Sequence, residues 1–154
     1  MPATVPPLTA FPSVARDVLR FRDTDGLGHV NNAVFATFCE TGRTVLLYDP
    51  AAPLVADGCD FVIARLELDF VAELHWPGEV LIGTGVRSVG RSSLRLLQGV
   101  FAAGKAVARA ESVLVQIDRL TRKASPLAQD TAERLAALSV ADPGEDEEAA
   151  PSAR

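Results

Sequence analysis

Hydrophobic and polar residues alternate along much of the chain after residue 60, and this period of two predicts β-strands. The clearest strand is 61–71, in which the apolar side is formed by Val62, Ala64, Leu66, Leu68 and Phe70. Further strands are predicted at 14–21, 79–89, 92–102 and 105–118. The last three are separated only by two-residue turns, Gly90-Arg91 and Ala103-Gly104, so they pair antiparallel, because a parallel crossover needs about a dozen residues.

Between the first two strands the period changes to three or four residues, which predicts one amphipathic helix over 32–47. Its apolar stripe is Val34, Phe35, Phe38, Cys39, Val45 and Leu46, with Gly42 among them. Asn31 or Asn32 provides an N-cap. A mid-helix glycine costs about 1 kcal/mol relative to alanine. Gly42 is therefore explained if the backbone approaches the sheet closely, and the pattern predicts an α+β fold with the helix laid across an antiparallel sheet.

The chain divides into three parts. Residues 1–12 hold four prolines and are expected to be a flexible lead-in, residues 13–138 form the domain with a short final helix at 130–138, and residues 139–154 form an acidic, unstructured tail. Leu81, Val89, Leu97 and Phe101 give the strands a second apolar face. A sheet covered on one side by one helix leaves its other face and its edges open. We therefore expect a homodimer.

Composition excludes several classes of function. The chain has 154 residues, 48% hydrophobic and 23% charged, as expected for one globular domain. Its net charge of −5 argues against nonspecific nucleic-acid binding. No apolar run reaches the roughly 18 residues of a membrane span, and the first 12 residues do not resemble a secretory signal. Cys39 and Cys59 are isolated, which predicts neither a disulfide nor a zinc site and favours a cytoplasmic protein.

The densest polar segment is 22–32, which joins a strand to the start of the helix. It contains carboxylates, glycines, an imidazole and two amides, and it ends where helix N–H groups are free. Such a helix start can stabilise an oxyanion, and a nearby carboxylate can act as base or nucleophile. The alternative is a well-capped loop without chemistry, because Asp, Gly and Asn are also common in turns.

Three other interpretations of this loop fit less well. A calcium loop would need oxygen ligands where Leu27 and Val30 stand. The run 23–26 is similar to the start of haloacid-dehalogenase-type phosphatases, but those need alternating parallel strands and helices. A metal site at His29 is not expected, because the chain's only other histidine, His75, lies in a turn.

The run Arg22-x-x-Asp25-x-x-Gly28-His29-Val30-Asn31-Asn32, followed by Phe35, Phe38, Glu40 and Arg43, resembles hotdog-fold acyl-CoA thioesterases of the 4-hydroxybenzoyl-CoA thioesterase type. The resemblance covers about residues 14–127. It implies a long helix wrapped by an antiparallel sheet, the architecture that the periodicity also predicts. It further implies a dimer or a dimer-of-dimers tetramer, with acyl sites at the interface between chains.

Carried over by position, the resemblance places the catalytic carboxylate at Asp25, as nucleophile or as base for a water. It places at Asn32 the backbone N–H that polarises the thioester carbonyl. The substrate-binding loop between them comprises Gly28, His29, Val30 and Asn31. Here His29 orients the loop or touches substrate. Further along the helix, Glu40 is expected to be structural, and Arg43 to be its ion-pair partner or a surface group.

Charge along the domain suits a coenzyme A substrate. Residues 23–79 hold ten acids and two bases, whereas residues 87–123 hold eight bases and two acids. Basic side chains bind phosphates, and arginine does so through a planar fork. The expected phosphate-binding residues are Arg91, Ser92, Arg122 and Lys123. No metal or other cofactor is expected.

The sequence therefore predicts an acyl-CoA thioesterase that hydrolyses a thioester, with an acyl-carrier-protein donor as an open alternative. Two further interpretations remain on the same fold. One is a non-catalytic protein that binds acyl thioesters. The other is a hotdog dehydratase, which the scarcity of histidines disfavours.

Overall fold

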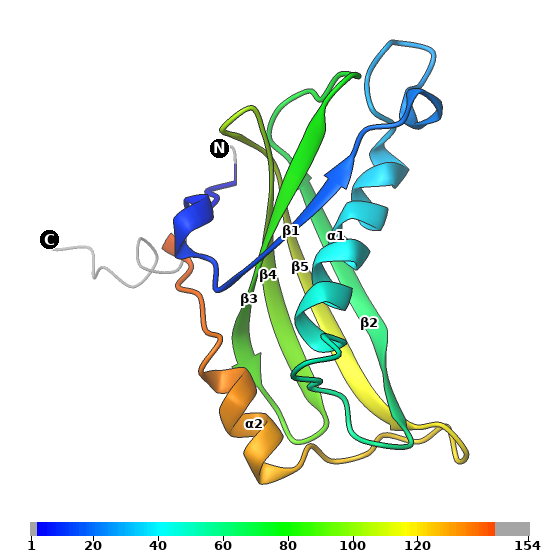
Figure 1. Cartoon of the computed structure of the whole chain (residues 1–154), viewed down its shortest axis with the longest axis vertical. Coiled ribbons are helices and arrows are strands. Elements are labelled where there is room, and N and C mark those ends of the chain that lie inside the picture. Colours follow the sequence, from blue (N-terminus) through cyan, green and yellow to red (C-terminus); the bar gives the residue numbers. More distant parts are fainter. Residues whose placement is uncertain (1–2, 144–154) are drawn as a thin grey trace, which may run out of the picture.

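The structure is a computed structural model that describes residues 3–143, and it consists of a five-stranded antiparallel sheet packed on one long helix (Figure 1). The helix is α1 (Asn32–Leu47). The strands are β1 (Ser13–Val18), β2 (Cys59–Phe70), β3 (Glu79–Val89), β4 (Ser93–Ala102) and β5 (Lys105–Asp118), in the order β1-β3-β4-β5-β2. The short helices are η1 (Leu8–Ala10), η2 (Phe21–Asp23) and α2 (Gln129–Ala136). This confirms the predicted α+β architecture.

No helix within residues 3–143 is both long and apolar enough to cross a membrane. The first predicted strand, 14–21, is shorter than expected: β1 ends at Val18, and the chain turns into η2 at Phe21. The hydrogen bond from the Arg20 N–H to the Asp23 carboxylate, 2.8 Å long, holds that turn. A buried capping carboxylate therefore ends the strand early.

Strand β2 does not keep the simple alternation that its sequence predicts. Its pairing with β5 shifts register at Ala64, which forms a bulge. Before the bulge Phe61 packs toward the core, and after it Leu66 and Leu68 do so. An extra residue in a strand exchanges its two faces. The predicted apolar side that grouped Val62 and Ala64 with the later leucines is therefore wrong.

Helix α1 buries one face against the sheet. Its buried residues are Phe35, Phe38, Cys39, Gly42, Arg43, Leu46 and Leu47. Val45, predicted for this face, is instead 47% exposed.

The close approach of α1 to the sheet occurs at Gly42. A Cβ atom there would lie 2.6 Å from Gln98 Nε2 and 2.7 Å from both Ile82 Cγ2 and Thr84 Oγ1. Those three side chains are fully buried. Gln98 Nε2 donates to the Cys39 carbonyl of α1 at 2.9 Å and to Thr84 Oγ1 at 3.0 Å. The helix backbone therefore lies directly on side chains of β3 and β4 at this point, which is the close approach that the mid-helix glycine predicts.

The outer face of the sheet is covered by segments near both ends of the described chain. Phe11, from the predicted flexible lead-in, and Val140, from the predicted tail, form one cluster with Leu97 of β4. A Cβ at Gly83 would lie 2.4 Å from the Phe11 ring, and a Cβ at Gly85 would lie 2.5 Å from Val140. Two glycines of β3 thus form slots for these side chains. The chain itself covers this apolar surface, for which a second copy was the expected cover.

Residues 139–143, which the sequence assigns to the acidic tail, lie against the sheet, and residues 144–154 lie outside the described residues. The Val140 N–H donates to the Val86 carbonyl of β3 at 3.1 Å. The Asp142 carboxylate is 6% exposed and lies 2.5 Å from Arg109 Nη2 and 3.9 Å from Arg87 Nη2. This acid therefore contributes to the folded domain.

Arg109 also donates to Glu111 at 2.6 Å. Burial alone would raise the pKa of Glu111, but the hydrogen bonds and charges of Arg109 and Arg95 outweigh it and lower that pKa. A carboxylate with a lowered pKa stabilises the fold above its unfolded pKa, about 4.5. That contribution is lost as the pH falls through the lower pKa of the folded state.

We expect Gly42→Ala to lower the free energy of unfolding by about 1–3 kcal/mol, because overpacking against three buried side chains outweighs the gain in helix propensity. Urea unfolding followed by circular dichroism measures this change. Gly26→Ala is the control, since no atom lies within 4 Å of a Cβ there. Equal stabilities of the two variants would contradict the close approach at Gly42.

We expect Asp142→Asn to lower the free energy of unfolding by about 1–3 kcal/mol, because it removes the carboxylate that pairs with the largely buried Arg109. Asp130→Asn, at an exposed position of α2, is the matched charge change and should stay within about 0.5 kcal/mol of the parent protein. The same urea titration at neutral pH measures both. An unchanged free energy of unfolding in Asp142→Asn would contradict a stabilising ion pair between Asp142 and Arg109.

Candidate active site

The loop before α1 is held by its own backbone. The Asp25 N–H donates to the His29 carbonyl at 2.8 Å, and the Gly28 N–H donates to the Asp25 carbonyl at 3.2 Å. Gly28 has a φ of +81°, a conformation that favours glycine. One oxygen of the Asp25 carboxylate, Oδ1, accepts from the N–H groups of Leu27 (2.8 Å) and His29 (3.2 Å). The carboxylate is thereby oriented by the loop that carries it.

The start of α1 leaves one backbone donor free. Asn31 is the N-cap, and its side-chain oxygen accepts from the Ala33 N–H at 2.9 Å. Its carbonyl accepts from Val34 N–H, and its own N–H donates to the Asp23 carbonyl. For the Asn32 N–H, no hydrogen bond is found within residues 3–143. This free donor lies at the positive end of the helix dipole, where it can stabilise negative charge on a substrate oxygen.

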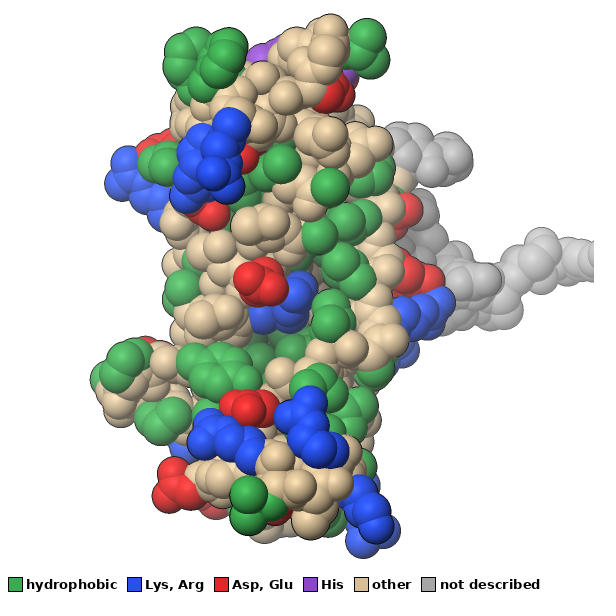
Figure 2. All heavy atoms as spheres, turned by 90° about the vertical axis from the view of Figure 1, so that its right-hand side faces the viewer, with side chains coloured by type: hydrophobic (Ala, Val, Ile, Leu, Met, Phe, Trp, Pro, Cys, Tyr) green, Lys and Arg blue, Asp and Glu red, His purple; other side chains and the backbone are tan. Residues whose placement is uncertain are grey.

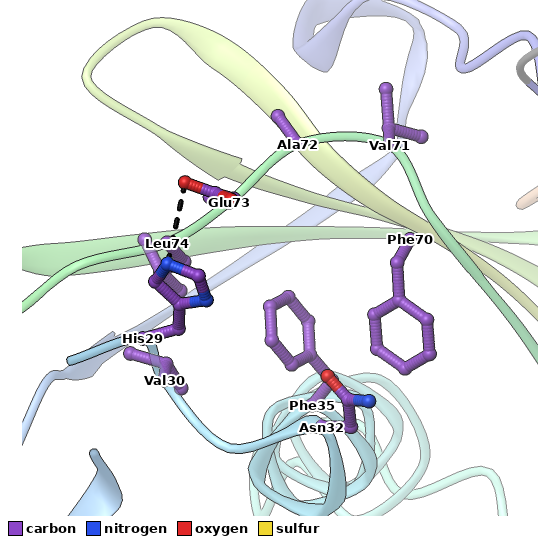
Figure 3. A pocket seen from close by; sticks show the side chains of 9 residues that line it. All are labelled: His29, Val30, Asn32, Phe35, Phe70, Val71, Ala72, Glu73 and Leu74. Atoms are coloured by element: carbon purple, nitrogen blue, oxygen red, sulfur yellow. Dashed lines mark ion pairs between the residues drawn. The ribbon is translucent and has the colours of Figure 1, made fainter. Parts of the chain in front are cut away.

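A pocket of about 270 Å³ opens beside this helix start (Figure 3). Its lining residues are His29, Val30, Asn32, Phe35, Phe70, Val71, Ala72, Glu73 and Leu74. The rings of Phe35 and Phe70 meet edge to face in it, with centroids 5.2 Å apart, and the Asn32 side chain lies beside them at the start of the helix (Figure 3). The pocket thus combines an apolar floor with a polar rim at the end of the helix. Asp25, in the loop that precedes the helix, is not among the residues that line the pocket.

Two further polar side chains meet His29 at the rim. Glu73 Oε2 lies 3.4 Å from His29 Nε2 and 3.3 Å from His75 Nε2, and the two imidazole rings are 4.9 Å apart, edge to face. His29 and His75 also form an isolated antiparallel bridge. The structure therefore brings the chain's two histidines together, a contact that the sequence does not predict. The segment after β2 crosses the loop before α1, a contact over more than 40 residues that local sequence patterns do not predict.

The four residues expected to bind phosphate lie elsewhere in the chain. Arg91 and Ser92 form the β3–β4 turn, and Arg122 and Lys123 follow β5. Both segments lie at the end of the sheet where α1 ends, opposite the end where α1 begins (Figure 1). Within one chain the structure does not bring these cations to the pocket.

Farther along α1, Arg43 lines a second hollow of about 260 Å³, between α1 and β2, together with Glu40. Arg43 is 9% exposed, and its Nη1 has no hydrogen-bond partner within the described chain. It forms no ion pair with Glu40 there, so the expectation of a surface group or an ion pair at Arg43 is wrong. Burial lowers the pKa of Arg43, against the smaller opposing effects of Cys39 and Glu40.

Cys39 is not a candidate nucleophile. Burial, only partly offset by the charge of Arg43, raises the pKa of its thiol to about 11. At neutral pH the thiol is therefore protonated, and the thiolate is the reactive form. Chemistry in this region has to come from oxygen and nitrogen groups.

Comparison with known proteins identifies the class. Residues 19–135 match the Thioesterase-like superfamily, which is most of the chain, and the chain therefore belongs to this family. Its structure matches those of hotdog-fold thioesterases, which confirms the resemblance seen in the sequence. No curated protein matches the chain significantly in sequence.

Three solved structures illustrate the similarity. A thioesterase from Thermus thermophilus, complexed with coenzyme A and zinc, is 35% identical, with a TM-score of 0.72 over 81% of this chain and 98% of that one. The PA5185 protein of Pseudomonas aeruginosa is 23% identical, with a TM-score of 0.77 over 88% and 97%. A 1,4-dihydroxy-2-naphthoyl-CoA thioesterase from Synechocystis is 22% identical, with a TM-score of 0.66 over 76% and 90%. The last two show the shared fold alone.

Proposed function

We propose that this protein is an acyl-CoA thioesterase that hydrolyses the thioester bond at the start of α1. The observation that carries the proposal is the free Asn32 N–H at the edge of an apolar pocket, next to the loop that holds Asp25. Family membership supports it, as does the coenzyme A bound to the 35% identical thioesterase.

In this mechanism the acyl group lies in the pocket lined by Phe35 and Phe70, and its carbonyl oxygen accepts a hydrogen bond from the Asn32 N–H. As the carbonyl carbon is attacked, negative charge develops on that oxygen, and the helix start stabilises it. Asp25 either attacks the carbon, giving an acyl anhydride that water then hydrolyses, or takes a proton from an attacking water. In both routes the coenzyme A thiolate leaves and the carboxylic acid is released.

We further propose that the active form is a homodimer joined along β2. This strand is an edge of the sheet, and on it Ile63 and Phe70 are 46% and 48% exposed. Figure 2 views the molecule from this side and shows hydrophobic side chains spread along the face, with acidic and basic atoms in a hollow among them. A buried guanidinium N–H without a partner costs about 1–3 kcal/mol, and an acceptor from a second copy would satisfy Arg43.

An antiparallel pairing of two β2 edges would also explain the position of the basic residues. In such a pair, each sheet has one end at which α1 begins and one at which α1 ends. The first end of one copy would lie beside the second end of the other copy. Arg122 and Lys123 of the second copy would then approach the pocket of the first, with Arg91 and Ser92 farther along the same end. This arrangement supplies the cations for the phosphates of coenzyme A, which one chain alone does not place at the pocket.

A second candidate is a protein that binds acyl thioesters without cleaving them. It is favoured by the position of the Asp25 carboxylate, which accepts two backbone N–H groups and does not line the pocket. The two candidates differ in thiol release: binding without release of free coenzyme A from any acyl-CoA supports the second.

We expect Asp25→Asn to lower kcat at least about 100-fold on any acyl-CoA that the parent protein hydrolyses, because the amide is neither a base nor a nucleophile. Thiol release over a panel of aliphatic and aromatic acyl-CoAs measures it. Asp49→Asn is the matched control. The Asp49 carboxylate accepts from the N–H of Ala51, as the Asp25 carboxylate does from that of Leu27, but it lies after the other end of α1. This variant should keep parental kcat. Parental turnover by Asp25→Asn would refute the assignment.

We expect Ile63→Lys to shift the protein from dimer to monomer and to lower thioesterase activity, because it adds a cation beside Arg43 in the proposed interface. Light scattering coupled to size exclusion measures the mass. Val14→Lys is the control: Val14 is equally exposed, at 46%, on the opposite edge strand β1. A monomeric parent protein, or a dimer lost only in Val14→Lys, would refute pairing through β2.

A further inference from the structure

Three metal-ligating side chains converge at the rim of the pocket. His29, Glu73 and His75 each offer one donor atom, and these atoms all lie within 4.8 Å of one another. They come from two segments far apart in the sequence, the loop before α1 and the connection between β2 and β3. Two imidazole nitrogens and one carboxylate oxygen form a donor set that suits Zn²⁺.

The backbone holds these side chains in register. The Val30 N–H donates to the Leu74 carbonyl at 2.7 Å, beside the bridge between His29 and His75. His75 Nδ1 donates to the Gly28 carbonyl at 3.2 Å. Because Nδ1 keeps its proton to donate this hydrogen bond, the lone pair of the neutral ring lies on Nε2. A hydrogen bond from the other ring nitrogen is the usual support of a metal-bound histidine.

That tautomer creates a mismatch that a cation resolves. His75 Nε2 then carries a lone pair and faces the Glu73 carboxylate at 3.3 Å, so two acceptors meet. A proton on Nε2 or a metal ion between the two atoms removes this mismatch. The same carboxylate oxygen lies 3.4 Å from His29 Nε2. Zinc bonds of about 2.0–2.1 Å in a tetrahedron imply ligand separations of about 3.3–3.4 Å. The two distances to Glu73 Oε2 match this value, and the donor atoms of all three residues lie within 4.8 Å of one another.

We propose that His29, Glu73 and His75 bind a divalent transition-metal ion, Zn²⁺, at the mouth of the pocket. Three protein ligands leave the fourth tetrahedral position open to water or to a substrate group. Since His29 and Glu73 line the pocket, that position lies at its rim. The ion also ties the loop that holds Asp25 to the segment after β2. The proposal does not rest on the proposed function, because it is tested with the metal alone.

The first test is calorimetric titration of ZnCl₂ into the full chain at about pH 7.5, with any histidine tag removed because a tag would bind zinc itself. We expect one ion per chain. The variants His75→Ala and Glu73→Gln should lose more than the roughly 10–100-fold in zinc affinity that is typical when a residue only orients a ligand. Glu79→Gln is the control: it removes the same charge from a neighbouring groove, where Glu79 pairs with Arg16, and should bind as the parent does. Equal binding by all variants would overturn the site.

The second test needs no substitution. The chain has only two histidines, so every imidazole resonance in a long-range proton–nitrogen NMR spectrum belongs to His29 or His75. One equivalent of ZnCl₂ should shift the Nε2 signals of both rings and leave Nδ1 of His75 protonated. A shift of one ring only, or of neither, would overturn the proposal. A hydrolysis assay then reports separately on the proposed function, because zinc binding and thiol release are two different measurements.

Discussion

The position of α1 on the sheet depends on one buried contact, in which Gln98 of β4 donates to the carbonyl of Cys39 beside the gap at Gly42. The Gln98 side chain is fully buried, and its nitrogen donates both to this helix carbonyl and to Thr84 of β3. Its oxygen has no hydrogen-bond partner within residues 3–143, so the nitrogen makes all of its hydrogen bonds there. This contact therefore fixes both the distance of the helix from the sheet and its position along the sheet. The position of the helix start, including the free Asn32 N–H, depends on it.

The site itself has a local and a non-local part. Within the loop, Asn31 caps the helix and Asp25 binds its own turn, so both depend on residues a few positions away. The rim depends on a crossing of distant segments that brings Glu73 and His75 beside His29. The local part leaves a backbone N–H free at the helix start, and the non-local part places ionisable side chains beside it.

These two parts also explain how far the sequence could predict the structure. Alternation, the helical period and the mid-helix glycine predicted the helix, most strands and the close approach at Gly42, because each is a local property. The bulge at Ala64 exchanges the two faces of β2. It arises from the pairing of β2 with β5, and no residue type in β2 predicts it. The contact of His75 with His29 was not predicted, because contact between distant segments cannot be inferred from spacing. Which of the predicted site residues act in catalysis stays a prediction.

The covering of the outer face has a consequence for larger assemblies. Phe11 and Val140 occupy glycine slots on the side of the sheet away from α1, so that side is already a finished surface. Direct stacking of a second sheet on these slots would displace both side chains and expose Leu97. With both segments in place, any molecule that packs on this side meets the covering segments and not the bare sheet, so the two sheets would lie farther apart than in direct back-to-back stacking.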